Sequence, residues 1–455
     1  MRGYDVIFLR FCDEIQNRKF VSNLSQPSGW FFLGYNSASQ QCHFIKAITF
    51  MQSTIQFYPS AQRADRATFS DIQLSALPPL SLYIHIPWCV RKCPYCDFNS
   101  HELGKAATDW ETPYVQTLIA DLESVLPQVW GRRLTSIFIG GGTPSLLSER
   151  AMDELLAAVR ARLPHISEME ITMEANPGTL EVGKLRGFRD AGVTRLSLGV
   201  QSFDDQLLHR IGRIHTADQA KYALDQAYAL FPKVNLDLMF ALPEQTMAQL
   251  QADVATALSF APTHMSYYHM TIEPNTLFHR HPPQVPDDEL ALDMQDYIQS
   301  ELARAGLRHY EVSAYAQARH ECQHNTNYWQ FGDYIGIGAG AHGKISQHDR
   351  IVRTARFKHP QRYLDAVAQG NAVETEVFLK RGELPFEYML NALRLRDGTT
   401  LAQMQMASGL NVVDLAPALS QAQAKGLMVK DAERLCVTDL GWRFLSDVQT
   451  LFLND

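Results

Sequence analysis

Three cysteines packed into eight residues are the part of this chain best suited to chemistry. Cys89, Cys93 and Cys96 lie directly after an apolar run that predicts a strand. Thiolates are the preferred ligands of iron–sulfur clusters and of zinc. Three of them leave one iron of a cubane cluster without a protein ligand, so that a small molecule can bind and react there. A structural zinc site is the alternative, but it needs four ligands, and no second Cys pair or Cys/His pair lies at finger spacing.

The overall composition favours a metal-binding protein of a reducing compartment. The seven cysteines are an odd number and do not suggest a disulfide framework. With a net charge of −8 and a pI of about 6.1, the chain lacks the excess positive charge that is typical of a nucleic-acid binder. No apolar run approaches the roughly 18 residues that span a bilayer, and no secretion signal is present, so we expect a cytoplasmic protein.

Residues 1–76 differ from the rest, because they are rich in Ser, Gln and Phe and show no sustained period of two or 3.6. The segment could be an ordered accessory piece. We favour a poorly ordered extension, or upstream sequence included by a wrong start codon, with Met51 as an internal candidate start.

From Leu77 onward, short apolar runs alternate with helical patterns. Strands are expected at 81–86, 136–139, 168–174, 195–199, 234–240 and 264–271, and helices at 112–125, 148–163, 179–191, 204–212, 216–230 and 246–259. This alternation implies βαβ units and a parallel sheet, which right-handed crossovers curl into an open or closed barrel. We therefore predict an α/β fold with a six-unit barrel core over 77–315. Functional residues would lie at the carboxyl ends of its strands.

The remaining chain divides into a connecting region and a tail. Residues 316–377 are less regular and contain the glycine-rich run 336–343, and a long helix is expected near 287–305, before them. Residues 378–455 predict a compact helical tail, with helices near 385–395, 400–408, 412–425 and 439–452 and a small hairpin at 427–437. The tail resembles a winged helix. Because residues 376–455 carry eight Lys/Arg against ten Asp/Glu, we expect a packing module and no nucleic-acid binding.

The cysteine spacing, Cys-x3-Cys-x2-Cys directly after a first barrel strand, resembles the signature of the radical S-adenosylmethionine (radical SAM) family. In that family the three thiolates hold a [4Fe–4S] cluster, and the amino and carboxylate groups of S-adenosylmethionine chelate the fourth iron. Electron delivery to the sulfonium then makes a 5′-deoxyadenosyl radical. The resemblance implies that Cys89, Cys93 and Cys96 are the cluster ligands and that Tyr95 lies near the adenine. His85, inside the strand, is expected to be a packed residue rather than a ligand.

Further polar and glycine-rich motifs follow the later strands. Gly140–Pro144 follows the second strand, and its glycines let backbone groups approach a ligand closely, although a tight βα turn is the alternative explanation. Glu174, Gln201, Arg213 and Asp237 lie at or after later strand ends. Asp237 lies in an otherwise apolar strand and needs a partner if it is buried; Arg213 could be that partner. Together these residues suit a ligand with one carboxylate, one amine and two ribose hydroxyls.

From Tyr83 to about Gly343 the chain resembles the oxygen-independent coproporphyrinogen III oxidases, and within them the haem chaperone branch, HemW. The stretches Ser-Leu-Tyr-Ile-His-Ile-Pro-Trp-Cys and Asp-Phe-Asn-Ser-His carry this resemblance. The S-adenosylmethionine contacts that it implies are Tyr83, Tyr95, Gly141, Gly142, Thr143, Glu174, Gln201, Arg213 and Asp237.

Two departures from the oxidase pattern put porphyrinogen decarboxylation in doubt. The oxidases have a further cysteine two places after the third cluster cysteine, where this chain has Phe98. Their distinctive N-terminal stretch, which helps to hold substrate, is not matched by residues 1–76.

A third motif, His-Asn-x-x-Tyr-Trp, is shared with the chaperone branch, where it is proposed to bind haem. Here it is formed by His324, Asn325, Tyr328 and Trp329. Imidazole is a common haem ligand and aromatic rings can stack on a porphyrin. The alternative is a loop histidine beside two core aromatics. Cys322 is either a further iron ligand or a small buried apolar residue.

The resemblance implies a haem chaperone that binds haem and transfers it to an unidentified acceptor protein. A [4Fe–4S] cluster and S-adenosylmethionine would gate transfer or assembly, and a reductant would serve the cluster. The alternative is a radical enzyme that acts on a tetrapyrrole, so whether the chain is an enzyme stays open.

Overall fold

The structure is a computed structural model that describes residues 71–104, 109–179 and 182–453. Our prediction for the N-terminal segment therefore lies outside the described residues, except for 71–76. In that short stretch Ile72 and Leu74 are buried, and the Leu74 N–H donates to the carbonyl of His348 at 2.9 Å.

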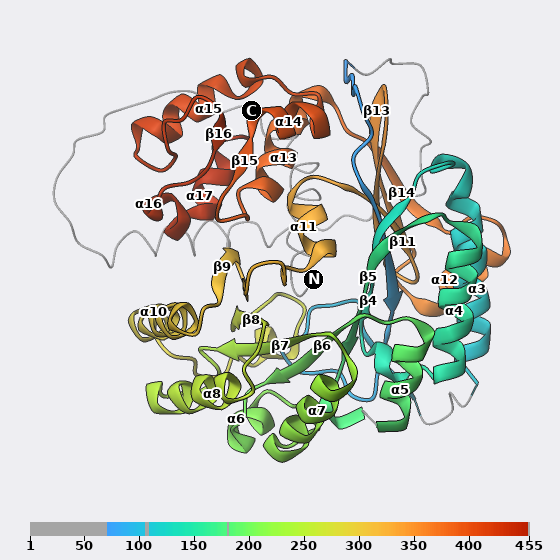
Figure 1. The fold of residues 1–455 in the computed structure, drawn as a ribbon, viewed down its shortest axis with the longest axis vertical. Helices are drawn as coiled ribbons and strands as arrows, with labels where there is room; N and C mark the ends of the chain where they lie inside the picture. The colour runs from blue at the N-terminus through green and yellow to red at the C-terminus, as the bar shows by residue number, and fades with distance from the viewer. Residues whose placement is uncertain (1–70, 105–108, 180–181, 454–455) are drawn as a thin grey trace. The chain divides into compact units, whose positions relative to one another are not determined.

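Within the described residues, twelve strands form one sheet, in the order β14-β13-β12-β11-β1-β4-β5-β6-β7-β8-β10-β9. Six of its parallel strands form the barrel: β1 (Leu80–Ile86), β4 (Leu134–Gly141), β5 (His165–Ala175), β6 (Arg195–Gln201), β7 (Lys233–Phe240) and β8 (His264–His269); β11 also pairs in parallel with β1. The helices between them lie on the outer side of the curved sheet (Figure 1). They are α3 (Glu111–Val125), α4 (Glu149–Arg162), α5 (Val182–Ala191), α6 (Asp205–Arg210), α7 (Ala217–Leu230) and α8 (Met247–Ser259). The predicted α/β fold with six βα units is confirmed.

Local sequence explains where several of these helices begin. The hydroxyl of Ser148 accepts the N–H of Ala151 at the start of α4. Thr216 and Thr246 each form a capping box, at the starts of α7 and α8. Such caps satisfy backbone N–H groups that have no partner inside the helix. Among the helices that the structure describes, none is both long and apolar enough to cross a lipid bilayer.

The sheet continues beyond the barrel on both edges. One edge carries β11 (Asp333–Ile337), β12 (His342–Gln347), β13 (Arg350–Arg356) and β14 (Val373–Phe378), and the other β10 (Ala314–Ala316) and β9 (Arg308–Glu311). The helices of this region are α9 (Leu277–Arg280), α10 (Asp288–Arg304), α11 (Gln323–Trp329) and α12 (Pro360–Ala368). Helix α10 was predicted from the sequence, whereas strands β11 to β14 were not. The glycine-rich run forms the end of β11, the turn after it and the start of β12.

The C-terminal part is mainly helical, as predicted. Its elements are α13 (Leu384–Ala392), β15 (Thr399–Thr400), α14 (Leu401–Ser408), α15 (Val412–Ala424), β16 (Arg434–Leu435), α16 (Asp439–Arg443) and α17 (Leu445–Thr450). The expected hairpin is reduced to a bridge between Met428 and Val437, and β16 pairs instead with the distant β15.

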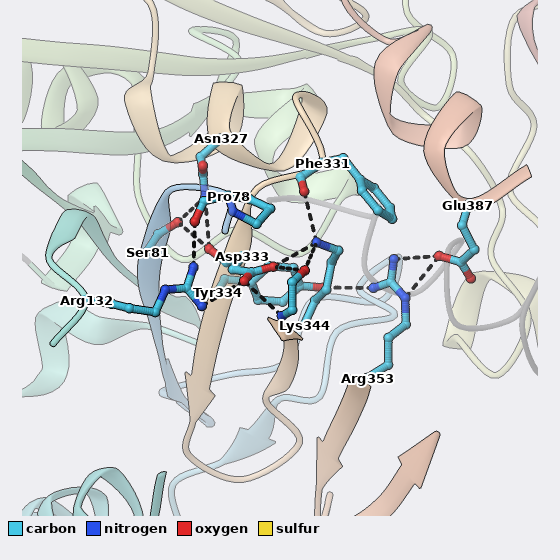
Figure 2. A network of polar contacts seen from close by, with 11 residues as sticks. Pro78, Ser81, Arg132, Asn327, Phe331, Asp333, Tyr334, Lys344, Arg353 and Glu387 are labelled. Carbon is cyan, nitrogen blue, oxygen red and sulfur yellow. Dashed lines mark hydrogen bonds and ion pairs between the residues drawn. The ribbon is translucent and has the colours of Figure 1, made fainter. Parts of the chain in front are cut away.

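A buried ionic network joins β11 to its neighbours (Figure 2). The Asp333 carboxylate lies 2.8 Å from Arg132 Nη1 and 2.8 Å from Lys344 Nζ. Asn327 of α11 donates to the backbone carbonyl of Asp333 and to the Ser81 hydroxyl. Because Asp333 and Lys344 are almost completely buried, each charge depends on the other for compensation.

We predict that Asp333→Asn lowers the free energy of unfolding by about 3–5 kcal/mol, because Lys344 then stays buried without its carboxylate. Urea denaturation followed by circular dichroism measures this change. The control is Asp190→Asn, which removes an exposed ion pair with Arg189 and is expected to cost about 0.5 kcal/mol or less. Equal stabilities of the two variants would contradict the prediction.

Candidate functional site

The cysteine loop leaves the carboxyl end of β1, and the glycine turn after β4 holds its first residues. The N–H of Gly142 donates to the Ile86 carbonyl at 2.7 Å, and that of Thr143 donates to the Trp88 carbonyl at 2.7 Å. A Cβ added to Gly142 would lie 2.5 Å from that same Trp88 oxygen, so only glycine permits this approach. The two motifs that the sequence presented separately are therefore one structural unit.

The loop also closes on itself. The short strands β2 (Trp88–Cys89) and β3 (His101–Glu102) pair in parallel at its base. The Lys92 ammonium donates to the carbonyl oxygens of Phe98 and Ser100, at 3.1 Å each. These contacts hold the loop without any contribution from the thiols themselves.

The three cysteines are half-buried, and two of their thiols have polar neighbours. Cys96 Sγ is 3.6 Å from Ser100 Oγ, and Cys93 Sγ is 3.7 Å from Arg213 Nη1. Burial is the main cause that raises the pKa of the Cys96 thiol to about 11, and the neighbouring Cys93 and Cys89 act in the same direction.

The donor set fits an iron–sulfur cluster better than a zinc ion. Among the described residues, no group of three His, Cys, Asp or Glu side chains converges on the position of a single metal ion. A cubane cluster does not need such convergence, because each of its thiolates binds a different iron. A coordinating thiol is deprotonated by the metal, so a raised pKa does not oppose ligation. A structural zinc ion, by contrast, takes four ligands.

The middle glycine of the turn packs against a buried histidine. Gly141 has φ +113°, and a Cβ added there would lie 2.6 Å from the His85 ring. The Gly141 N–H donates to the Glu174 carboxylate at 3.2 Å. The His85 ring is bonded to the Tyr83 hydroxyl and to the Asn99 carbonyl, both at 2.9 Å, and burial lowers its pKa to about 4. The expectation that His85 is a packed strand residue is confirmed.

Gln201 has the geometry of a ligand-facing residue. It ends β6 just after a bulge at Gly199, with φ +71°, a conformation that residues with a side chain rarely adopt. Its side chain is buried, and its Oε1 has no hydrogen-bond partner among the described residues. Backbone strain together with an unpaired buried acceptor at a strand end is typical of a binding position.

Asp237 lies within the neighbouring strand β7, and Arg213 lies in the turn between α6 and α7. Asp237 is buried in β7, and its carboxylate accepts from Ser197 Oγ at 2.8 Å and from Asn235 Nδ2 at 3.0 Å. These two side chains provide the buried partners that the sequence required for Asp237. Arg213 donates to the Gly199 carbonyl at 2.6 Å and also faces the cysteine loop, so it joins the end of β6 to that loop.

The two predicted tyrosines occupy different surroundings. Tyr83 is buried in the barrel, with its ring centroid 6.4 Å from that of Phe138. Tyr95 packs against an apolar cluster that includes Met270 and Phe278. Tyr95 therefore lies on the cysteine-loop side of the strand ends, whereas Tyr83 points into the interior.

A small cavity of about 20 Å³ lies inside the barrel and is lined by residues from both groups of predicted site residues. Glu174 and Asp237 line it, and so do Cys322 and Asn325 from the segment around the start of α11. Most of its other lining residues are polar. Asn325 Oδ1 is buried and has no hydrogen-bond partner among the described residues.

Helix α11 lies against the amino-terminal half of the barrel strands, away from the cysteine loop. Arg195, the first residue of β6, donates to the carbonyls of His320 and Glu321, just before α11. The Gln323 N–H donates to the Glu170 carboxylate of β5 at 2.9 Å. The motif that begins at His324 and the cysteine loop therefore lie at opposite ends of the barrel strands.

His324 is fully buried, and both of its ring nitrogens are engaged. Nδ1 lies 3.0 Å from Ser136 Oγ and Nε2 lies 3.2 Å from the Tyr328 hydroxyl. Its ring also packs on Phe138, with 5.3 Å between centroids, and burial holds its pKa well below the usual value. In this conformation neither nitrogen is open to an iron.

The other residues of this segment are also packed inside the protein. The Tyr328 ring meets Tyr334 at 4.4 Å between centroids, and the Arg394 guanidinium lies 4.4 Å above the Trp329 ring. Cys322 is buried in an apolar cluster, and burial raises its pKa to about 11. These contacts match the alternative in which the motif is part of the core.

Two residues at the site were not singled out from the sequence. Ser100 bonds the Cys96 thiol, and its spacing of four residues from that cysteine was the only available signal. Phe138 contacts both Tyr83 and His324. Nothing in the sequence distinguished Phe138 from an ordinary strand residue, because its two partners lie far away along the chain.

Comparison with known proteins gives matches to two family models. The model of the radical SAM superfamily matches residues 83–257, and the model of the HemN C-terminal domain matches residues 379–444.

The proteins similar to this chain include several heme chaperones. The heme chaperone HemW of Escherichia coli is 47% identical over 382 residues, which cover 83% of this chain and 99% of that protein. HemW of Bacillus subtilis is 34% identical, with 82% and 99% covered. Among solved structures, the coproporphyrinogen III oxidase HemN of Escherichia coli has a TM-score of 0.72 at 20% identity, covering 85% of this chain and 97% of that one. The structural match shows the fold alone.

We predict that Gly142→Ala lowers stability by about 1–3 kcal/mol, because its Cβ meets a backbone oxygen that cannot move aside cheaply. It should also lower the iron and sulfide bound after anaerobic reconstitution, since the start of the cysteine loop is displaced. Thermal unfolding and metal analysis measure the two effects.

Gly104→Ala is the matched control, because a Cβ there has no atom within 4 Å. We expect it to behave like wild type in both measurements. If Gly142→Ala also bound iron and sulfide like wild type, the glycine turn would not position the loop.

Proposed function

Because this chain belongs to the HemW family of radical SAM proteins, we propose that it is a haem chaperone, which binds haem and transfers it to an acceptor protein. The observation that carries the proposal is the continuous similarity to HemW proteins, which extends from the cysteine loop through α11 to the C-terminal helices. The acceptor protein and the reductant are not identified by the chain's own residues. The free thiols of the loop favour a reducing compartment, and we propose the cytoplasm.

Cys89, Cys93 and Cys96 are the proposed ligands of a [4Fe–4S] cluster. When bound, the cluster would supply one-electron chemistry toward S-adenosylmethionine. Arg213 beside Cys93 contributes positive charge next to the thiolates, and Ser100 Oγ, 3.6 Å from Cys96 Sγ, would donate a hydrogen bond to the thiolate form of Cys96. Such hydrogen bonds and charges around the sulfurs set the properties of a cluster.

The proposed S-adenosylmethionine contacts lie in the glycine turn, at the strand ends and on the two tyrosines. They are Tyr83, Tyr95, Gly141, Gly142, Thr143, Glu174, Gln201, Arg213 and Asp237. The carboxylates would accept hydrogen bonds from the cofactor's amine and ribose hydroxyls, and Arg213 would pair with its carboxylate. The unpaired Gln201 Oε1 supports this assignment, because a bound donor would satisfy it.

His324, Asn325, Tyr328 and Trp329 are the proposed haem contacts on α11. Because Ser136 and Tyr328 hold both nitrogens of His324, iron ligation there requires these bonds to break and α11 to leave its place against β4. Haem retention by this helix is therefore coupled to a local opening of the fold. The cavity that reaches from Asp237 to Asn325 would let occupancy at one end of the barrel influence the other.

The polar interior cavity supports a second candidate function, a radical enzyme acting on a tetrapyrrole or another small substrate. The cavity borders Glu174 and Asp237, where such an enzyme would place the reacting part of its substrate. Phe98, at the position of an additional oxidase cysteine, counts against oxidase activity. Anaerobic release of 5′-deoxyadenosine and carbon dioxide, dependent on coproporphyrinogen III, would favour the enzyme over the chaperone.

We predict that any one of Cys89→Ala, Cys93→Ala and Cys96→Ala abolishes the iron–sulfur absorbance after anaerobic reconstitution, because the cluster then lacks a thiolate. Cys322→Ala and Cys436→Ala are the controls and should keep it. Full cluster content in any of the first three variants would remove that cysteine from the ligand set.

We predict that the reconstituted wild-type protein retains haem through gel filtration and that His324→Ala retains much less, because the imidazole of α11 is then missing. The titration is run with and without S-adenosylmethionine. His165→Ala is the control, because His165 is exposed on β5 and bonds only the neighbouring Ile166 carbonyl. Retention by His324→Ala equal to that of wild type would exclude His324 as a ligand.

A further inference from the structure

We propose that the exposed segment Leu277–His281, which contains α9, is the first docking site for haem, at the mouth of the barrel beside the cysteine loop. This proposal rests on the haem-chaperone function. It adds a site that differs from α11 in position and in accessibility, and it assigns the incoming ligand to side chains that the cofactor assignments do not use.

Backbone contacts place α9 directly against the cysteine loop. The Phe278 N–H donates to the Pro94 carbonyl, which lies between Cys93 and Tyr95, at 3.0 Å. On the other side of Pro94, a Cβ added to Gly212 would lie 2.6 Å from Pro94 Cδ. Helix α9, the cysteine loop and the turn at Gly212 are thus three neighbouring parts of one rim.

This rim exposes apolar surface. Leu277 is 56% exposed and Ile214 is 40% exposed, and each lies within two residues of the contacts to Pro94. Beneath them, Phe278 and Ile211 belong to the buried apolar cluster on which Tyr95 packs. Large apolar side chains exposed above an apolar cluster suit a flat hydrophobic ligand such as a porphyrin.

The same segment offers the two polar groups that haem requires. His279 and His281 are exposed, and within the described part of the chain their side chains have no hydrogen-bond partner. Imidazole is a common axial ligand of haem iron. Arg280, between them, is exposed and makes no ion pair with a described residue, and a guanidinium pairs well with a propionate carboxylate. Iron, macrocycle and propionate therefore each find a matching group within five residues.

The contrast with α11 indicates the order in which haem would reach the two sites, α9 first and α11 second. Both ring nitrogens of His324 are hydrogen-bonded in the interior, so neither is available to the iron of an arriving haem. The imidazoles of His279 and His281 are open from the start. A haem docked on α9 would also lie beside Tyr95 and the proposed cofactor site, whereas α11 lies at the opposite end of the strands.

Stopped-flow mixing of ferric haem with the reconstituted full-length protein tests the proposal. We expect a fast Soret change in wild type that reports imidazole ligation on α9. In the double variant His279→Ala/His281→Ala the affinity of this first complex should fall by about tenfold or more, and free imidazole should restore its spectrum. Single variants identify the ligand.

Arg280→Gln should weaken the first complex by about threefold, and haem dimethyl ester should show the same loss with wild type and no further loss with Arg280→Gln. Leu277→Ser should weaken haem and iron-free protoporphyrin IX alike. His165→Ala should match wild type throughout, and His324→Ala should keep the fast phase while losing retained haem.

A fast phase that is unchanged in the double histidine variant would overturn the α9 site and leave the chaperone function intact. Wild-type protein that neither shows a fast phase nor retains haem would instead overturn the chaperone function itself. The two failures are therefore distinguishable in one series of measurements.

Discussion

The geometry of the site depends on the close approach of the glycine turn after β4 to the start of the cysteine loop. Two backbone N–H groups, of Gly142 and Thr143, donate to carbonyls at the end of β1 and in β2. These bonds form only because residue 142 lacks a Cβ. A loop with three half-buried thiols has no core of its own, so its shape comes from the parallel strands β1 and β4, which bring the two turns to the same edge of the sheet.

The same parallel arrangement gives the barrel two chemically distinct ends. The carboxyl ends collect the thiols, Arg213 and Gln201, and Gln201 has a strained backbone and an Oε1 without a hydrogen-bond partner among the described residues. The amino ends are closed by α11 and by ion pairs such as Arg195 with Glu170 at 3.1 Å. The polar cavity between them borders residues of both groups. In the proposed function, the cofactor would lie at one end of this interior and the haem-binding helix at the other, so the cavity would connect the two sites.

The six βα units could be predicted from the sequence because each has its own local signals, a buried apolar strand and a capped amphipathic helix. Strands β11 to β13 could not, since Asp333, Lys344 and Arg356 place charges where a strand should be apolar. In the folded chain Lys344 pairs with Asp333, and Arg356 pairs with Asp121 at 3.1 Å. Asp121 lies on α3, more than two hundred residues earlier, so the compensation exists only in the tertiary structure.

The cysteine loop and the His324 motif differ in the same way, because the first is defined by residues close in sequence and the second by partners distant in sequence. The three cysteines that we propose as cluster ligands lie within eight residues, so their spacing alone was enough to propose them. The state of His324 depends on Ser136 and Phe138, 188 and 186 residues earlier in the chain, and the motif gave no sign that both ring nitrogens would be occupied. A local motif can identify a candidate histidine, but only the fold shows whether its ring nitrogens are accessible to a metal. His324 is buried with both ring nitrogens hydrogen-bonded, whereas His279 and His281 are exposed. We therefore assign haem capture to His279 and His281 and haem retention to His324, and the opening of α11 would be the step between capture and retention.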